Sequence, residues 1–199
     1  MFLDLCASVL IPVYTLFFAK GYGWFSTNFS VIGNMFRRKE VFVLWAVLVG
    51  LYFFFSLRQI IRKMPGKVKG SFLVPVAVVL LLFAITTPYL PQEFPLKAVL
   101  HIVFAMLASA CLVIVTAYLF WQMKPYAPGR ANKYLRFLGL IVAGSVVLFF
   151  VSGIISSAME IFFVLGMVAL MERVRRYPEW ERETEEGKSG GCPQSHEMT

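Results

Sequence analysis

Apolar runs of about 18 residues recur along this chain, and they constrain its fold more than any other feature. A helix of that length covers the roughly 30 Å hydrocarbon layer of a membrane. A spanning segment must satisfy its own backbone hydrogen bonds in lipid, which favours helices. The sequence therefore predicts an all-α polytopic membrane protein, a six-transmembrane-helix bundle with one short interfacial helix in its first external loop. The six predicted spans are 2–19, 41–57, 71–87, 98–120, 137–155 and 158–174.

The composition argues against a water-soluble core. Of the 199 residues, 59% are hydrophobic and 15% are charged, whereas soluble domains carry about 25% charged residues. The net charge of +8 could indicate a nucleic-acid partner. Most basic residues, however, lie in short loops beside apolar runs, where membrane topology concentrates them. We therefore expect no nucleic-acid partner. The three cysteines show no metal-ligand spacing, and we expect neither a metal site nor another cofactor.

The last long apolar stretch divides into two spans because Gly153, Ser156 and Ser157 indicate a tight reversal. Without that turn the stretch would form one long helix, and the number of spans would fall to five. Beyond the sixth span the composition changes, since residues 177–199 contain six acidic and two basic side chains and little to bury. We expect residues 1–176 to form the transmembrane domain and 177–199 a largely disordered, acidic cytoplasmic tail.

The loop charges predict an orientation. Twelve basic residues fall on the side of the two chain ends, and five fall on the other side. Because short cytoplasmic loops carry an excess of Lys and Arg, we expect both termini in the cytoplasm. As a separate expectation, the membrane is the plasma membrane of a bacterium. The twelve are Arg58, Arg62, Lys63, Lys67, Lys69, Lys124, Arg130, Lys133, Arg136, Arg173, Arg175 and Arg176, and the five are Lys20, Arg37, Arg38, Lys39 and Lys97.

The first external loop contains the stretch "WFSTNFSVIGNMFRRKE", residues 24–40, which is rich in polar groups for a chain of this kind. Its apolar residues recur at the spacing i, i+1, i+4 and i+5 from Val31, which suits a short helix lying in the membrane interface. A side-chain oxygen of Ser26, Thr27 or Asn28 would cap the first turn of that helix.

Two ionisable residues of distant spans are expected at the same external depth. His101 lies near the external end of the fourth predicted span, and it shares a helix face with Ala105 and Ala108. Because small residues mark close helix contacts in membranes, this face should point into the bundle. Glu160 lies near the external start of the sixth span, where a buried ionisable group needs a partner. The candidate ligand-binding residues are Asn28, Ser30, Asn34, Arg37, Arg38, His101 and Glu160.

A structural interpretation of these residues stays open. Glu160 paired with Arg37 or Arg38 would form a network that fixes the bundle without binding a ligand. Glu93 lies in a loop on the same side. Asp4 falls at the opposite, cytoplasmic end of the first span, where we expect it to pair with a basic loop residue.

The stretch "STNFSVIGN" after a first span, followed by "LWAVLVGLYFFFSLRQ", resembles a group of bacterial six-helix membrane proteins of unknown function. More distantly, the layout resembles the damage-regulated autophagy modulator family, whose members carry a short Ser/Asp/Gly-containing motif in the equivalent loop. The matching residues here are Ser30 through Gly33, without an acidic residue. The resemblance implies a multispanning membrane protein linked to lipid handling.

Two classes of function follow from these observations. The preferred hypothesis is a protein that binds a lipid head group or small amphiphile in an external-side polar cavity, either as a transporter or as a membrane-organising protein, with membrane lipids as its partners and no catalytic residues. The alternative is a metal-free intramembrane lipid hydrolase with His101 as base, assisted by Glu160 or Ser30. No nucleophile elbow supports that alternative. One histidine in the membrane domain cannot build a zinc site of several histidines, as in the ceramidases.

Overall fold

The computed structural model describes residues 2–34, 38–64 and 68–176, and no strand occurs in these segments. The predicted acidic tail, 177–199, lies outside them. The described elements are α1 (Phe2–Leu5), a π-helical turn η1 (Cys6–Leu10), α2 (Ile11–Ala19), α3 (Phe29–Asn34), α4 (Lys39–Lys63), α5 (Leu73–Thr86), α6 (Pro95–Met123), α7 (Pro128–Ser152) and α8 (Ser157–Arg176). The prediction of an all-helical chain is confirmed for this part of it.

Four helical segments are long and apolar enough to cross a membrane: Phe2–Ala19, α4, α6 and α7. The helices at the other two predicted spans, α5 and α8, are not both long enough and apolar enough to be counted with these four. Helix α5 is apolar but has 14 residues, so at about 1.5 Å per residue it is shorter than the hydrocarbon layer. Helix α8 has 20 residues and carries Glu160, Glu172 and three arginines at its end.

The predicted break between the last two helices is present. Helix α7 ends at Ser152, and Gly153 adopts a left-handed conformation with φ 67°, which suits a residue without a Cβ atom at a helix end. Helix α7 also begins at Pro128, nine residues before the predicted start. Proline is favoured in the first helical turn, and the polar residues that follow extend the helix beyond the apolar run on which the prediction rested.

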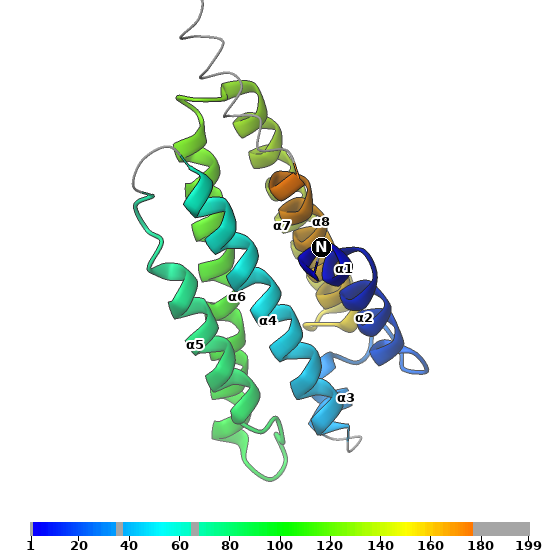
Figure 1. Cartoon of the computed structure of the whole chain (residues 1–199). Helices are drawn as coiled ribbons and strands as arrows, with labels where there is room; N and C mark the ends of the chain where they lie inside the picture. The colour runs from blue at the N-terminus through cyan, green and yellow to red at the C-terminus, as the bar shows by residue number, and fades with distance from the viewer. Residues whose placement is uncertain (1, 35–37, 65–67, 177–199) are drawn as a thin grey trace, which may run out of the picture.

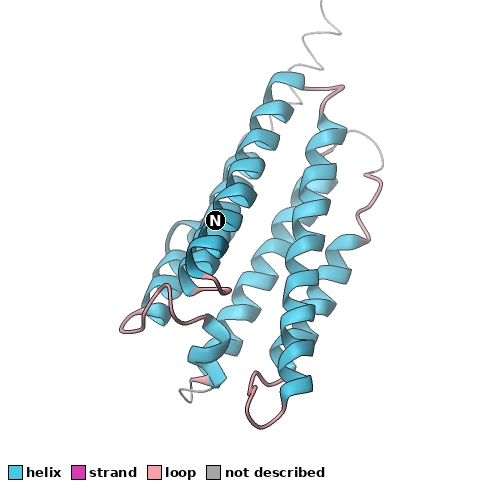
Figure 2. Ribbon diagram, turned by 180° about the vertical axis from the view of Figure 1, so that it is seen from behind, coloured by secondary structure: helices cyan, strands magenta, loops and turns pink. Residues whose placement is uncertain are grey.

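Helix α4 is the centre of the bundle, since it packs against α2, α3, α5 and α8. Figures 1 and 2 show α4, α5 and α6 side by side, with α1, α2 and α8 forming a second group. Buried polar groups join these helices. Trp45 Nε1 donates to Thr15 Oγ1 over 2.9 Å, and the Tyr52 hydroxyl donates to the Val168 carbonyl over 3.3 Å. Such pairs remove the cost of burying unpaired polar groups.

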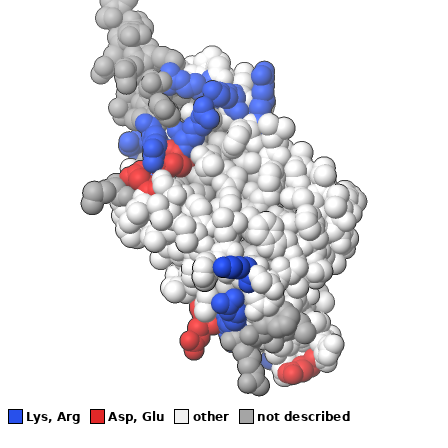
Figure 3. All heavy atoms as spheres, turned by 90° about the vertical axis from the view of Figure 1, so that its right-hand side faces the viewer, with Lys and Arg blue, Asp and Glu red and all other residues white. Residues whose placement is uncertain are grey.

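The outer surface is apolar along the helices and charged near their ends. Leu96 and Phe150, on the outside of α6 and α7, are 72% and 76% exposed, which in water would be costly. On the face seen in Figure 3, a band without charged side chains separates two charged ends. The distribution is that of a protein whose middle contacts lipid.

Candidate functional site

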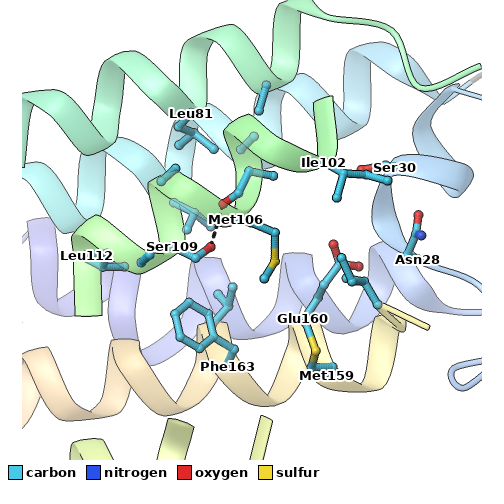
Figure 4. Close-up of a pocket in the computed structure, with 18 of the residues that line it drawn as sticks. Asn28, Ser30, Leu81, Ile102, Met106, Ser109, Leu112, Met159, Glu160 and Phe163 are labelled. Atoms are coloured by element: carbon cyan, nitrogen blue, oxygen red, sulfur yellow. Dashed lines mark hydrogen bonds between the residues drawn. The ribbon is translucent and has the colours of Figure 1, made fainter. Parts of the chain in front are cut away.

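A cavity of about 890 Å³ lies among α4, α5, α6, α7 and α8. Its wall is mostly aliphatic and aromatic. Figure 4 shows Met106 of α6 and Phe163 of α8 on facing walls, with Asn28, Ser30 and Glu160 toward one end. The polar residues in the lining include Ser26, Thr27 and Tyr89 as well as Asn28, Ser30, His101 and Glu160, and we call the last four the polar cluster.

The cavity opens sideways between α6 and α7. Met106 and Ile114 of α6 line it and are exposed, and so are Val146 and Phe149 of α7. These helices meet at their short connection, residues 124–127, and their far ends border the cavity. An amphiphile lying among lipids could therefore enter with its apolar chain without passing through water.

Helix α3 holds Ser30 in the polar cluster because Asn28, just before the helix, and Phe29, its first residue, are both anchored. The Asn28 side chain caps it, since its Oδ1 atom accepts from the Val31 N–H over 2.8 Å. Phe29 is fully buried, with its ring centroid 5.1 Å from that of Phe18 and 4.6 Å from that of Trp45. Ser30, the next residue, lines the cavity. The predicted short helix is thus present, with Asn28 as its cap.

Ser30 and His101 form a direct hydrogen bond. The Ser30 Oγ atom lies 2.6 Å from His101 Nε2. His101 Nδ1 lies 2.7 Å from the Ala84 carbonyl oxygen and 3.0 Å from that of Thr87. Carbonyl oxygens only accept hydrogen bonds, so Nδ1 carries a proton and donates to them, which selects the Nδ1–H tautomer of the neutral imidazole. The Nε2 atom is then the acceptor, and the Ser30 hydroxyl donates to it. His101 is 3% exposed, so this arrangement is held in the interior.

The start of α8 is tied to the same loop. Glu160 Oε2 accepts from the Phe29 N–H over 2.7 Å. The Ser157 N–H and hydroxyl both donate to the Thr27 carbonyl, at 2.7 and 3.0 Å, and the Ala158 N–H donates to the Trp24 carbonyl at 2.9 Å. Helix α8 therefore holds residues 24–29 in place, and through them it positions Ser30.

The structure brings four of the seven candidate residues together in the polar cluster. Asn34 is not among the residues that line the cavity, because its Nδ2 atom donates to the Ser30 carbonyl over 3.0 Å, within α3. Arg38 follows α3 and does not line the cavity either. Arg37 lies outside the described residues. Glu93 is exposed in the connection between α5 and α6.

The proposed ion pair between Glu160 and Arg38 is absent. Within the described segments, which leave out Arg37, the carboxylate of Glu160 has the Phe29 N–H as its partner and forms no ion pair. The backbone donor is available because α3 begins at that point. Asp4 does pair with a basic residue, but with Arg175 of α8 instead of a loop residue.

Sequence reasoning missed the apolar extent of the cavity. Ala105 and Ala108 of α6 were taken as marks of close helix contact, and in the structure they line open space. Ala46 of α4 and Ala77 of α5 also line it. Small residues at facing positions on several helices could have indicated a cavity, but the same pattern is expected where helices pack tightly.

Searches of family models, curated proteins and solved structures found no match to this chain. Groups of three or more His, Cys, Asp or Glu residues that could hold a metal ion were also absent, as far as the described segments show. The cavity and its polar cluster are therefore the features of this chain that indicate a function.

Proposed function

We propose that this chain is an integral membrane protein that binds a lipid or other single amphiphile, with the apolar chain in the cavity and the head group at the polar cluster. The observation that carries the proposal is the amphiphilic lining of the cavity. It is mostly apolar, has a volume of about 890 Å³, and has Asn28, Ser30, His101 and Glu160 at one end. Its volume falls within the roughly 300–1,000 Å³ range of small-molecule sites.

The polar cluster must supply most of the selectivity. An acyl chain that leaves water gains about 0.8 kcal/mol per buried methylene group. A chain that leaves a bilayer gains little, because lipid tails are as apolar as the cavity wall. The difference between a bound amphiphile and a bulk lipid therefore arises at the head group, where His101 and Ser30 are already oriented.

The proposed topology has six passes, formed by residues 2–19 and by α4 to α8, with the polar cluster on the external side and both termini in the cytoplasm. It is supported by the twelve-to-five distribution of basic residues and by the ion pair between Asp4 and Arg175, which joins the start of the first helix to the end of α8. In this topology the head group would come from the outer leaflet. Either a transporter or a membrane-organising protein would begin with this binding step.

Filling the cavity tests the binding proposal. Ala105→Phe places a ring into the cavity one turn from His101, and it should lower the co-purifying amphiphile about tenfold, as measured by native mass spectrometry with lipid analysis. Leu107→Phe is the matched control, because Leu107 is exposed on the outside of the same helix. Equal lipid retention in both variants would overturn the proposal.

Cysteine labelling tests the topology. A cysteine at Gln92, in the exposed connection between α5 and α6, should react with an impermeant reagent added outside. A cysteine at Gly129, where added side-chain atoms meet open space, should react only after the membrane is opened. The reverse pattern would place the polar cluster on the cytoplasmic side.

A further inference from the structure

The Ser30 hydroxyl is bonded differently from the hydroxyls of three serines in the long helices. Ser109, Ser145 and Ser152 each donate to the carbonyl of the residue four positions earlier in their own helix, at 2.8 to 3.0 Å. This is the ordinary way in which a hydroxyl is satisfied in an apolar helix. Ser30 lies in the first turn of α3, and its hydroxyl donates to an imidazole nitrogen at 2.6 Å instead.

The histidine in turn is oriented by a third group. Its Nδ1 atom faces the carbonyl oxygens of Ala84 and Thr87, which keeps the lone pair of Nε2 directed at Ser30. A nucleophile within hydrogen-bond reach of a base, with the base held by a third group, is the geometry of an activated hydroxyl. A backbone carbonyl here has the orienting role that a carboxylate has in the serine proteases.

We propose that Ser30 and His101 form a nucleophile–base pair that hydrolyses a carboxylic ester in the amphiphile held by the cavity. The inference rests on the proposed binding function, because the cavity must place the ester. In an amphiphile of this kind the ester joins the apolar chain to the head group. A chain lying against Met106 and Phe163 would therefore bring its ester to the polar cluster.

The chemistry proceeds in two balanced steps. Ser30 Oγ attacks the ester carbonyl carbon while His101 Nε2 takes the hydroxyl proton. The bond from carbon to the alcohol oxygen then breaks, and His101 returns the proton to the leaving alcohol. Water next attacks the acyl-Ser30 ester with its proton passing to His101, the carboxylic acid leaves, and Ser30 regains its hydroxyl proton. The net reaction consumes one ester and one water and yields one acid and one alcohol.

Two further residues have defined roles. The Asn28 Oδ1 atom is occupied as the cap of α3, so its Nδ2 group is the donor that Asn28 can offer to the oxyanion of the tetrahedral intermediate. Glu160 is a positioning residue, since it holds the Phe29 N–H beside Ser30. Neither residue exchanges a proton with substrate in this scheme.

A reactive probe tests the nucleophile directly. The full chain, purified in lipid nanodiscs, is treated with dodecyl fluorophosphonate, and the adduct is located by intact mass and peptide mapping. We expect one adduct, on Ser30, with Ser109 unmodified. His101→Gln should slow labelling about a hundredfold, since a general base contributes about 10²–10⁴-fold. Ser30→Ala should abolish labelling, and Ser152→Ala should label as the wild type does.

The same preparations should release nitrophenolate from p-nitrophenyl dodecanoate in proportion to labelling. The proposal would be overturned if the wild-type protein were unmodified at Ser30, or if His101→Gln were labelled as fast as the wild type. Neither outcome depends on how Ser30→Ala folds. Co-purified lipid is measured in each sample. Bound lipid without a Ser30 adduct overturns only the catalytic inference, whereas a Ser30 adduct whose rate is unchanged in Ala105→Phe overturns the binding site on which it rests.

Discussion

The two ends of α8 each belong to a group of polar or charged residues, and the two groups are bonded differently. At the start of the helix, Glu160 accepts a backbone N–H and faces the cavity with Ser30 and His101. At its other end, Arg175 is bonded to both Asp4 and Glu172, and Arg176 adds a further bond to Glu172. We call Asp4, Glu172, Arg175 and Arg176 the ion-pair cluster. Opposite charges there neutralise one another, and none of the four residues lines the cavity.

The two clusters differ in role: the ion-pair cluster stabilises the bundle, whereas the polar cluster offers its groups to a ligand. The ion-pair cluster joins the first and last described helices, which are far apart in sequence, through bonds between its own charged groups. In the part of the chain that the structure describes, the polar cluster has a carboxyl group without an ion pair and an oriented hydroxyl beside open space. Substitutions in the ion-pair cluster should therefore lower the stability of the fold without changing the amount of bound ligand. Substitutions in the polar cluster should change ligand binding more than stability.

The largest loss of stability is expected from Arg175→Leu. Removing one partner of a buried pair leaves uncompensated charge, which costs about 3–5 kcal/mol when the site is fully buried. Asp4 is 35% exposed in its side chain, so we expect about 2 kcal/mol, measured as a lower Tm. The exposed Arg173→Ala is the control and should change stability by less than about 0.5 kcal/mol. A loss of bound lipid from Arg175→Leu at unchanged Tm would remove the distinction between the clusters.

Glu160→Leu should come next. It removes the acceptor of the buried Phe29 N–H, and an unsatisfied buried donor costs about 1–3 kcal/mol. Glu160→Gln retains an acceptor oxygen and should recover most of that loss. Thermal unfolding of the two variants separates the hydrogen bond to Phe29 from other effects of the carboxyl group. If both variants lose the same stability, the carboxyl group of Glu160 has a role beyond its bond to α3.

A double-mutant cycle tests whether the polar cluster acts as a unit. His101 and Glu160 hold adjacent residues of α3, Ser30 and Phe29. Once one of these bonds to α3 is lost, the helix is less ordered and the other bond stabilises it less. The double variant His101→Ala with Glu160→Ala should therefore lower the free energy of unfolding by about 1 kcal/mol less than the sum of the two single variants. Strictly additive losses in Tm-derived free energies would show that the two sides of α3 are independent.

The smallest effect is expected from Arg38→Gln. Arg38 does not line the cavity, and substitutions of this kind usually change stability by less than about 0.5 kcal/mol. Co-purified lipid should also be unchanged within about twofold. A tenfold loss of lipid would instead assign the head group to the basic residues after α3, since guanidinium groups bind phosphate well.

Part of this site could be predicted because it follows from local rules. Ser26, Thr27 and Asn28 were the predicted candidates for capping the helix that follows them, and Asn28 is the one that caps α3. His101 and Glu160 could be placed at one depth because each lies near the start of a predicted span, and both spans were predicted to begin on the same side. Their actual partners could not be predicted. The Phe29 N–H and the Ala84 carbonyl are backbone groups, which every residue possesses, so sequence gives no means of selecting them.

The sequence by itself determined the helical class, the break at Gly153 and the apolar outer surface, because length, hydropathy and turn chemistry act over a few residues at a time. Only the tertiary structure decided that Ala105 and Ala108 face a cavity and that Arg175 meets Asp4. Both outcomes depend on the positions and angles at which whole helices pack. Those angles come from the sum of many weak contacts between residues distant in sequence, and no single stretch of the chain encodes them.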